Sequence, residues 1–351
     1  MEYTEMIKGI KKPENALLVA AQHKIDHKTK PLGALGMLED IACRMCLIQN
    51  DLEPRIKKKM LFVYAGDHGI ANEGVSAYPA EVTPQMVLNF LGGGAAINVL
   101  CKHNDIDIRI IDAGVNFDFK PQKGLVQKKV RKGTDNFLKG SAMTRDEAER
   151  SIQNGIDVFN EAYPEGDGGI IAVGDMGIGN TTSASAIISA VTGKDPKETT
   201  GSGTGINEST LKRKIDTIKN ALSKHAPDPG DPLDILSKVG GFEIGGITGT
   251  VLAAAHRGVP VVLDGIISTA GGLLAYLFNN NAGEYLFAGH KSVEKGHMAA
   301  LDHMHLNPII DLNMRLGEGS GAALAVNIIE AACRIMCEMA SFEEAGVSNK
   351  E

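Results

Sequence analysis

Short apolar runs that end abruptly in Gly, Asp or His recur along this chain. Runs of about four to six residues rich in Val and Ile, bounded in this way, are typical of buried strands in a parallel sheet. The chain has five: MLFVYAGDHG (60–69), IDIRIIDAGVN (106–116), GGIIAVGDMGIGN (168–180), VPVVLDG (259–265) and EYLFAGH (284–290).

Apolar residues with helical spacing fill the segments between these runs, at 84–91, 95–103, 144–163, 183–193 and 208–222. Thr144 followed by Glu147 has the capping-box spacing that marks a helix start. Alternating strands and helices predict an α/β fold built on a doubly wound, mostly parallel sheet. Ligands bind such sheets outside the carboxyl ends of the strands, so the polar residues that end the runs predict one site there.

Two segments between these elements predict loops. HAPDPGDP (225–232) contains three prolines, which exclude a continuous helix. YPEGDGG (163–169) predicts a turn by its glycines and proline.

Composition narrows the class of protein. A chain of 351 residues with 43% hydrophobic residues can build one large domain with a smaller part. A net charge of −7 argues against nucleic acid or an anionic membrane as partner. We find no signal-like N-terminal stretch and no apolar run near the roughly 20 residues that cross a bilayer, which favours the cytoplasm.

The five cysteines, an odd number, fit a reducing compartment. Cys43 and Cys46 form a CxxC, and Cys333 and Cys337 lie four apart, both in segments with helical spacing. A redox or zinc site would need a strand-to-helix turn or a matching second pair. We therefore interpret these cysteines as small core-facing hydrophobic residues.

Two glycine-rich stretches are candidates for phosphate binding. GDMGIGNTTSASA (174–186) places a turn before a helix, where free backbone N–H groups and the hydroxyls of Thr181, Thr182 and Ser183 suit a phosphate. GSGTG (201–205) precedes a helix that carries Lys214, a point charge for ribose phosphate. Neither is a GxGxxG or GxxxxGK[ST] motif, and each could instead be an ordinary turn or flexible loop.

The stretch 65–100 has polar residues of another kind. An aromatic side chain with several hydrogen-bonding groups, as in Ser76, Tyr78 and Gln85, suits a planar heterocycle. Metal binding by His68, His290 and His297 is the alternative. The last two are seven residues apart, about 10 Å along a helix, which is too far to share one ion.

Two acids stand out at predicted strand or helix ends. Asp264 in VVLDG could orient its neighbours or act on substrate. Glu318 lies among glycines in RLGEGSGAALA (315–325), before an apolar helix. The stretch is either a turn that starts the helix or a backbone held open around a ligand with Glu318 aimed into the gap. A glycine-lined, dry pocket would raise the pKa of this carboxyl.

From about residue 28 to 347 these motifs together resemble the nicotinate-nucleotide–dimethylbenzimidazole phosphoribosyltransferase family. The resemblance rests on KPLGALGMLE, AGDHGIANEGVSAYPAEVTPQMVLNFLGGGAAINVL, DAGVN, GTDNF, GDMGIGNTTSASA, GSGTGI, KVGGFEIGGITG, VPVVLDGIIS, GHKSVEKGH and RLGEGSGAALA, in this order. It implies transfer of phosphoribose from nicotinate mononucleotide to 5,6-dimethylbenzimidazole, with inversion at C1′ and without metal or cofactor.

The resemblance also implies an architecture. A Rossmann-like sheet domain (59–310) would join a small helical domain made of both chain ends (1–58 and 311–351), and the protein would be a dimer. By the same resemblance Glu318 is the general base, which accepts a proton from one nitrogen of the acceptor while the other attacks C1′.

Further roles follow from the resemblance by position. Ser76, Tyr78 and Gln85 would line the pocket for the acceptor base. The phosphoribosyl and nicotinate groups would be held by Asp175, Gly177, Asn180, Gly203, Lys214 and Ser292. The chain departs from the usual motifs at Asp175, where Glu is common, and at Leu32 and Ala34 in KPLGALG.

Other activities remain open at this level. One branch of the family joins phenol or p-cresol through oxygen and works as two unlike subunits, so the partner could be an identical or a paralogous chain. A diphosphate-dependent phosphoribosyltransferase is disfavoured, because VVLDG has one acid where that class favours two. A non-catalytic nucleotide-binding subunit would be expected to lack Glu318, and a dehydrogenase to have GxGxxG.

Overall fold

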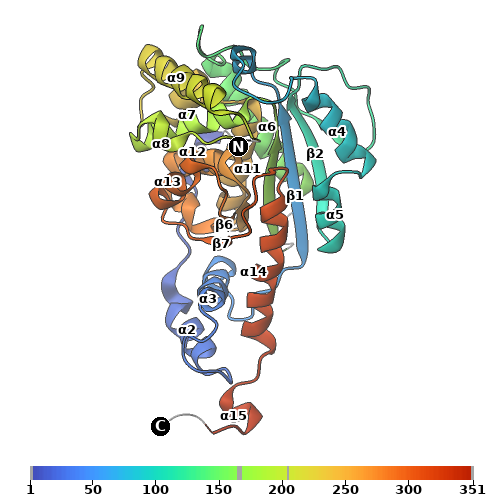
Figure 1. Cartoon of the computed structure of the whole chain (residues 1–351). Coiled ribbons are helices and arrows are strands. Elements are labelled where there is room, and N and C mark those ends of the chain that lie inside the picture. Colours follow the sequence, from blue (N-terminus) through green and yellow to red (C-terminus); the bar gives the residue numbers. More distant parts are fainter. Residues whose placement is uncertain (1–2, 164–167, 204, 349–351) are drawn as a thin grey trace.

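A single parallel sheet organises the computed structural model, which describes residues 3–163, 168–203 and 205–348. Its order is β3-β2-β1-β4-β5-β6-β7 (Figure 1). The strands are β1 (Lys58–Gly66), β2 (Asp107–Gly114), β3 (Leu125–Gln127), β4 (Gly169–Met176), β5 (Val261–Leu263), β6 (Leu286–His290) and β7 (Pro308–Ile310). The predicted α/β, doubly wound parallel sheet is confirmed, and each of the five predicted strands is present.

The edge strands β3 and β7 were not predicted. Each has three residues, and β7 begins with Pro308. Runs this short carry no apolar signal, and their strand geometry comes from pairing with β2 and β6.

Strand order reverses between β1 and β4. The chain moves outward from β1 through β2 to β3 and then returns to pair β4 with the free side of β1. In the register, Ala65 of β1 lies between Asp112 of β2 and Met176 of β4. This reversal opens the crevice in which doubly wound sheets bind ligands.

Helices cover both faces of the sheet (Figure 1). The helices of the described residues are α1 (Tyr3–Lys8), α2 (Leu18–Asp26), α3 (Met37–Gln49), α4 (Val82–Gly92), α5 (Ala96–His103), α6 (Arg145–Ala162), α7 (Asn180–Thr192), α8 (Pro196–Thr199), α9 (Glu208–His225), α10 (Pro232–Val239), α11 (Phe242–His256), α12 (Ile266–Phe278), α13 (Lys295–His303), α14 (Ser320–Glu338) and α15 (Phe342–Ala345). The five predicted helical segments correspond to α4, α5, α6, α7 and α9. The capping box at Thr144 and Glu147 is confirmed, with both reciprocal hydrogen bonds formed.

Helix α11 is buried along almost its whole length and packs tightly on α6. A Cβ atom on Gly249 would lie 1.9 Å from the Ile152 carbonyl oxygen, and one on Gly155 would lie 2.0 Å from the Gly246 carbonyl oxygen. These glycines let the two backbones touch. A helix that is apolar on all sides has no periodic stripe, which explains why the sequence pattern did not predict it.

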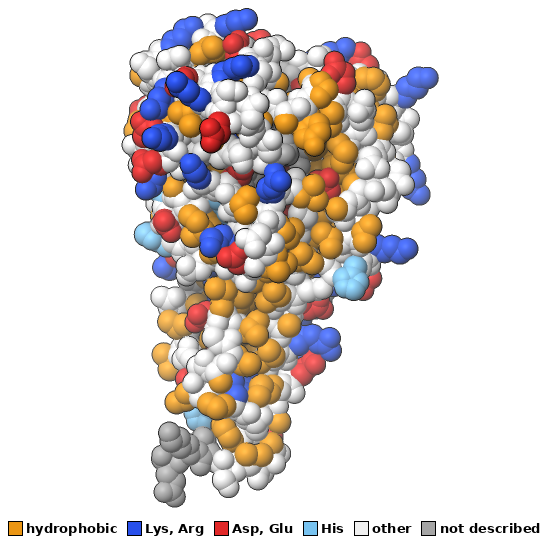
Figure 2. Space-filling view, viewed as in Figure 1, with side chains coloured by type: hydrophobic (Ala, Val, Ile, Leu, Met, Phe, Trp, Pro, Cys, Tyr) orange, Lys and Arg blue, Asp and Glu red, His pale blue; other side chains and the backbone are white. Residues whose placement is uncertain are grey.

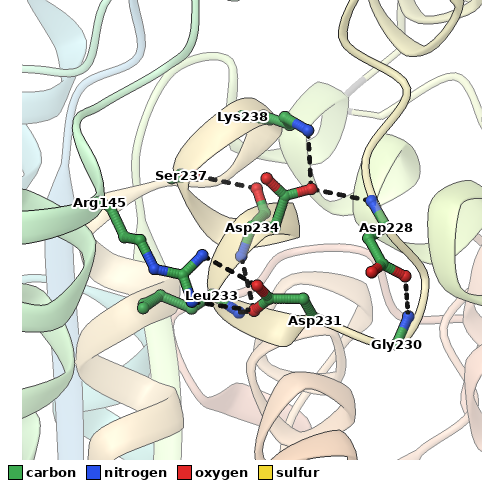
Figure 3. Close-up of polar contacts among 8 residues, drawn as sticks. All are labelled: Arg145, Asp228, Gly230, Asp231, Leu233, Asp234, Ser237 and Lys238. Atoms are coloured by element: carbon green, nitrogen blue, oxygen red, sulfur yellow. Dashed lines mark hydrogen bonds and ion pairs between the residues drawn. The ribbon is translucent and has the colours of Figure 1, made fainter.

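The predicted loop at 225–232 is confirmed between α9 and α10, and its acids have structural partners (Figure 3). Asp231 accepts hydrogen bonds from the Leu233 and Asp234 backbone N–H groups and pairs with Arg145 of α6 at 2.9 Å. Asp234 pairs with Lys238 at 2.8 Å. Of the other predicted turn, 163–169, residues 164–167 lie outside the described residues.

The chain ends contribute to different parts of the molecule. Below the sheet, α3 packs against α14 and α2 packs against α3, close to α15 (Figure 1). Helix α1 instead packs against α11, where Asn279 donates to the Ile7 carbonyl. Domain boundaries at residues 58 and 311 remain a proposal.

The cysteines of α3 and α14 belong to the core. Cys43, Cys46 and Cys333 are buried and unbonded to one another. Burial raises the pKa of Cys46 and of Cys333 to about 12, so both thiols stay protonated and poorly nucleophilic. Their interpretation as core-facing residues is confirmed for these three, whereas Cys337 is half-buried and its thiol donates to the Pro54 carbonyl.

Two helical stretches reach membrane-spanning length and apolarity, 82–103 and Ser320–Glu338. The expectation that no stretch comes near this length was therefore wrong. The first is divided into α4 and α5 by a left-handed turn at Gly93. The second is α14, which packs against the sheet and α3. Burial in the protein core accounts for its apolar character. Apolar side chains also gather over the surface of the lower part of the molecule, where α2, α3 and α14 lie (Figure 2).

Candidate active site

A cavity with about 830 Å³ of empty space, partly open to solvent, lies at the carboxyl ends of β4, β5 and β6. Strand ends and the loops that follow them supply its walls. Seven of the predicted site residues line it: Ser76, Asp175, Gly177, Asn180, Gly203, Lys214 and Ser292. The structure thus brings together residues more than 200 positions apart in the sequence.

One end of the cavity suits an anion. Helix α7 begins at Asn180, directly after a left-handed Gly179. Lys214 reaches in from α9 and donates to the Thr181 hydroxyl at 2.7 Å. Burial lowers the pKa of Lys214 to about 8 and the charge of Glu294 opposes this, so a bound anion would stabilise the ammonium form.

Only one of the three predicted phosphate-binding hydroxyls reaches the cavity. Thr181 lines it, whereas Thr182 and Ser183 are buried in the body of α7. The Ser183 hydroxyl contacts the Val239 and Gly240 carbonyls instead. Neither Thr182 nor Ser183 therefore lines the cavity, contrary to expectation, because both are fully buried and Ser183 faces the end of α10.

Three charged or titratable residues in the wall were not predicted as part of this group. Arg315 donates to the Gly203 carbonyl at 3.2 Å, which joins the loop before α14 to the loop before α9. Glu294 is buried, and its Oε2 has no hydrogen-bond partner among the described residues. His290, at the end of β6, faces the same space. All three residues lie in GHKSVEKGH or RLGEGSGAALA, two of the motifs that carry the family resemblance, and these motifs could have pointed to them.

Asp175 ends β4 with both carboxylate oxygens engaged. Its Oδ2 accepts from the Asn180 amide at 2.8 Å, and its Oδ1 accepts from the Ser268 hydroxyl at 3.4 Å. Burial raises the pKa of Asp175 well above its usual value, and the nearby charges of Asp264 and Glu243 add to this. The two hydrogen bonds hold the Asp175 carboxyl in place in the cavity wall.

Glu318 sits in a backbone turn that few residues adopt. Gly317, Glu318 and Gly319 have φ of 84°, 64° and 91°, all left-handed. Such a conformation is rare for a residue other than glycine and is typical of functional sites held by their surroundings. The flanking glycines therefore make the turn possible.

The glycines create less open space than expected from the sequence. Gly317 lines the cavity. However, a Cβ on Gly319 would lie 2.9 Å from Leu61, and one on Gly321 would lie 2.0 Å from the His290 ring. Close packing of protein atoms, as well as room for a ligand, thus requires glycine here.

Asp264 holds this turn from below. Its carboxylate accepts three backbone hydrogen bonds: from Gly319 (3.0 Å), Gly321 (2.7 Å) and Ala322 (3.2 Å), the last two in the first turn of α14. All its strong hydrogen bonds thus go to the backbone that carries Glu318. This geometry favours an orienting function for Asp264 over direct action on substrate.

The Glu318 side chain points toward α5. Its Oε2 accepts from the Ile97 backbone N–H at 3.2 Å, and the residue is 5% exposed. Burial raises the pKa of Glu318, the Ile97 hydrogen bond opposes this, and the charge of Asp264 adds to it. Glu318 itself is not a wall residue of the cavity, whereas its neighbour Gly317 is.

The residues predicted for the acceptor base are divided. Ser76 lines the cavity, but Tyr78 and Gln85 do not, and both are exposed. Tyr78 has 52% of its surface accessible. Gln85 lies on α4, the helix that precedes α5. Of the three residues, only Ser76 therefore lies at the cavity in this structure.

The histidines considered for metal binding have protein partners. His68 is fully buried and bonds Glu243 at 2.7 Å. His290 and His297 have ring centroids 6.1 Å apart, so the 10 Å expected for a helix was wrong, because residues 291–294 form a loop. His297 accepts from the Ser292 N–H, and burial lowers its pKa to about 3. No group of three or more metal-binding side chains occurs among the described residues.

Comparisons with known proteins agree on one family. The family model described as "Phosphoribosyltransferase" matches residues 10–347. The nicotinate-nucleotide–dimethylbenzimidazole phosphoribosyltransferase of Geotalea uraniireducens is 54% identical over 99% of this chain and 98% of its own. The enzyme of that name from Chloroflexus aggregans is 49% identical, with the same coverage.

A solved structure gives the same answer. CobT from Thermus thermophilus superimposes with a TM-score of 0.91 at 44% identity, covering 95% of this chain and 99% of that one. This agreement confirms the resemblance seen in the motifs. The chain therefore belongs to the nicotinate-nucleotide–dimethylbenzimidazole phosphoribosyltransferase family of pentosyl-transferring enzymes.

Proposed function

We propose that this protein transfers phosphoribose from nicotinate mononucleotide to 5,6-dimethylbenzimidazole or a related base, with inversion at C1′, in cobamide biosynthesis. The products are an α-ribotide and nicotinate. The observation that carries the proposal is the position of Glu318, a buried carboxylate beside a cavity that has a lysine and a helix N-terminus at the end suited to an anion.

In this proposal the cavity binds nicotinate mononucleotide. The start of α7 and the Lys214 ammonium suit its phosphate, since both carry positive charge. Asp175, Asn180 and Ser292 offer hydrogen bonds for the sugar and the nicotinate. The nicotinate nitrogen leaves as a neutral pyridine, so the protein needs to supply little more than position, which can contribute several kcal/mol.

Glu318 acts as the general base in this scheme. One nitrogen of the acceptor attacks C1′ while the other loses its proton to the Glu318 carboxylate. Proton transfer to a positioned base contributes roughly 10²–10⁴-fold. Ser76 and Tyr78, in the loop before α4, and Gln85 on α4 would line the space for the acceptor base.

Product analysis tests the proposal. Purified protein is incubated with nicotinate mononucleotide and either dimethylbenzimidazole or phenol, without added metal, alongside Glu318→Gln. We expect α-ribazole phosphate and nicotinate from the native protein and a loss of roughly 10²–10⁴-fold in the variant. Full activity of Glu318→Gln would refute its role as base.

The same experiment separates the alternatives. A phenolic product alone would assign the protein to the phenol/p-cresol branch, in which Glu318 would deprotonate the attacking oxygen. Absence of nicotinate release with either acceptor would indicate a missing paralogous subunit or a non-catalytic nucleotide-binding function.

Three further properties are part of the proposal. We expect a homodimer, or a heterodimer with a paralogous subunit, which light scattering of the purified protein would detect. We expect cytoplasmic localisation, as for an enzyme that uses small soluble substrates. We also expect activity to persist after treatment with a chelator, because the reaction needs no metal or cofactor.

A further inference from the structure

Helix α5 presents its first turn to Glu318, and one side chain fixes that turn. Three exposed glycines, Gly92 to Gly94, connect α4 to α5 and impose no conformation of their own. Asn98 bridges this connection. Its Oδ1 accepts from the Ala95 N–H at 3.1 Å, and its Nδ2 donates to the Phe90 carbonyl at 3.0 Å.

The Ile97 N–H is a free donor of the helix start. The first N–H groups of a helix have no partner within the helix. The Asn98 and Val99 N–H groups close onto the Ala95 carbonyl, which leaves Ile97 to donate to Glu318 at 3.2 Å. The direction of this donor thus depends on how Ala95 and Asn98 hold the turn.

The other charged groups near Glu318 are acids. Asp264 approaches from the end of β5 through the backbone of Gly319, and Asp175 from the end of β4, where its carbonyl accepts from the Glu318 N–H at 3.2 Å. His290 lies behind Asp264, 3.6 Å from it. No cation bonds the Glu318 carboxylate among the described residues, and the one hydrogen bond that it accepts there comes from the first turn of α5, whose N-terminus has positive polarity.

We propose that Asn98 is a positioning residue, which orients the Ile97 N–H so that the Glu318 carboxylate stays ionised and in place to accept a proton. This inference rests on the proposed function of Glu318 as general base. Asn98 makes no contact with the cavity and acts through Ala95 and Ile97.

The test is the pH dependence of kcat/KM, which reports the free enzyme. We expect the acidic limb of Asn98→Ala to move up by about one pH unit, since a hydrogen bond to a charged group contributes about that much. Activity below the limb should fall about tenfold and should approach the native value at alkaline pH. The acceptor base titrates in the same way with every variant, so its ionisation cannot cause a difference between their pH profiles.

Two further variants separate positioning from stability. Asn98→Gln keeps an amide at the third helical position, where Gln bonds the N-cap N–H, and should restore the native profile. Asn327→Ala removes a hydrogen bond to Asn104 at the other end of α5, and should leave the acidic limb unchanged. If Asn98→Ala does not fold, Asn98→Ser, with its shorter acceptor, should show a smaller shift in the same direction.

An equal loss of kcat/KM at all pH values in Asn98→Ala, or no change at all, would overturn the inference. Glu318→Gln distinguishes failure of the proposed function: if its residual activity keeps the native acidic limb, Glu318 is not the base. A carboxyl-carbon NMR titration of the substrate-free protein, with Glu318→Gln for assignment, would measure the same shift without any turnover.

Discussion

Replacing Asp264 by Asn tests how the turn that carries Glu318 is held. Asp264 is fully buried, and its two oxygens accept three backbone hydrogen bonds. An Asn side chain has one acceptor oxygen. If this oxygen keeps Gly321 and Ala322, its NH₂ group faces the Gly319 N–H, and a donor meets a donor.

The magnitude follows from these contacts. Loss of the bond to Gly319 destabilises by about 1.5–3 kcal/mol, and the two remaining bonds weaken because they lose the charge. A neutral Asn recovers part of this, since burial raises the pKa of Asp264. We expect a net loss of about 3 kcal/mol. With an unfolding entropy of ~2.1 cal/mol/K per residue over 351 residues, Tm should fall by about 4 °C.

The effect on activity should be larger than the effect on stability suggests. Gly319 is the residue after Glu318, so its release moves the base, and a displacement of about 1 Å can lower the rate by ~10²-fold. Thermal unfolding by circular dichroism and kcat with nicotinate mononucleotide would be measured below the transition of both proteins.

Asp112→Asn is the matched control. This buried aspartate near the end of β2 accepts from the Val115 N–H at 2.9 Å and pairs with Lys129 at 3.0 Å, and it does not line the cavity. The Asp112→Asn substitution should lower Tm and leave kcat unchanged. If Asp264→Asn kept kcat within about twofold of the native enzyme, the orienting function would be refuted.

Other outcomes follow from single contacts. The ammonium of Lys214, whose pKa burial lowers to about 8, is lost as pH rises through that value, so calorimetry should show weaker binding of nicotinate mononucleotide above about pH 8. Lys214→Met should weaken binding by about 10- to 100-fold and abolish this pH dependence. Burial raises the pKa of Asp175 above 3.8, so the folded protein binds a proton that the unfolded chain has lost, and stability falls as pH rises from that value. In Asp175→Asn the free energy of unfolding should lose this decline, so denaturant titrations should show the variant becoming more stable relative to the native protein as pH rises above about 4. Thr144→Ala removes the N-cap of α6 and should destabilise by about 1 kcal/mol without a change in kcat; an unchanged midpoint would mean that Glu147 alone caps the helix.

Much of the fold could be read from the sequence where the signal is local. Strand β1 is buried on both faces, so the segment 60–69 contains a continuous apolar run. Such a run can be recognised in the sequence without knowing which strands pair with it. Helix α6 has one apolar stripe and a capping box, both visible within a few residues. Helix α11 and strands β3 and β7 have no such local signal, since full burial removes periodicity and pairing creates the short strands.

The site could be predicted in part for the same reason. The sequence by itself determined that strand ends carry Asp175, Asp264 and His290, because parallel strands expose their carboxyl ends at one edge. It also determined, through motif resemblance, the family to which the chain belongs.

Only the tertiary structure decided what each group contacts. It directs the Asp264 carboxylate to three backbone N–H groups and turns Thr182 and Ser183 away from the cavity. It also sets the Glu318 carboxylate on the Ile97 N–H, 221 residues away in the sequence. The reason is physical: hydrogen-bond direction and burial depend on the relative placement of distant segments, which no local pattern of residues encodes.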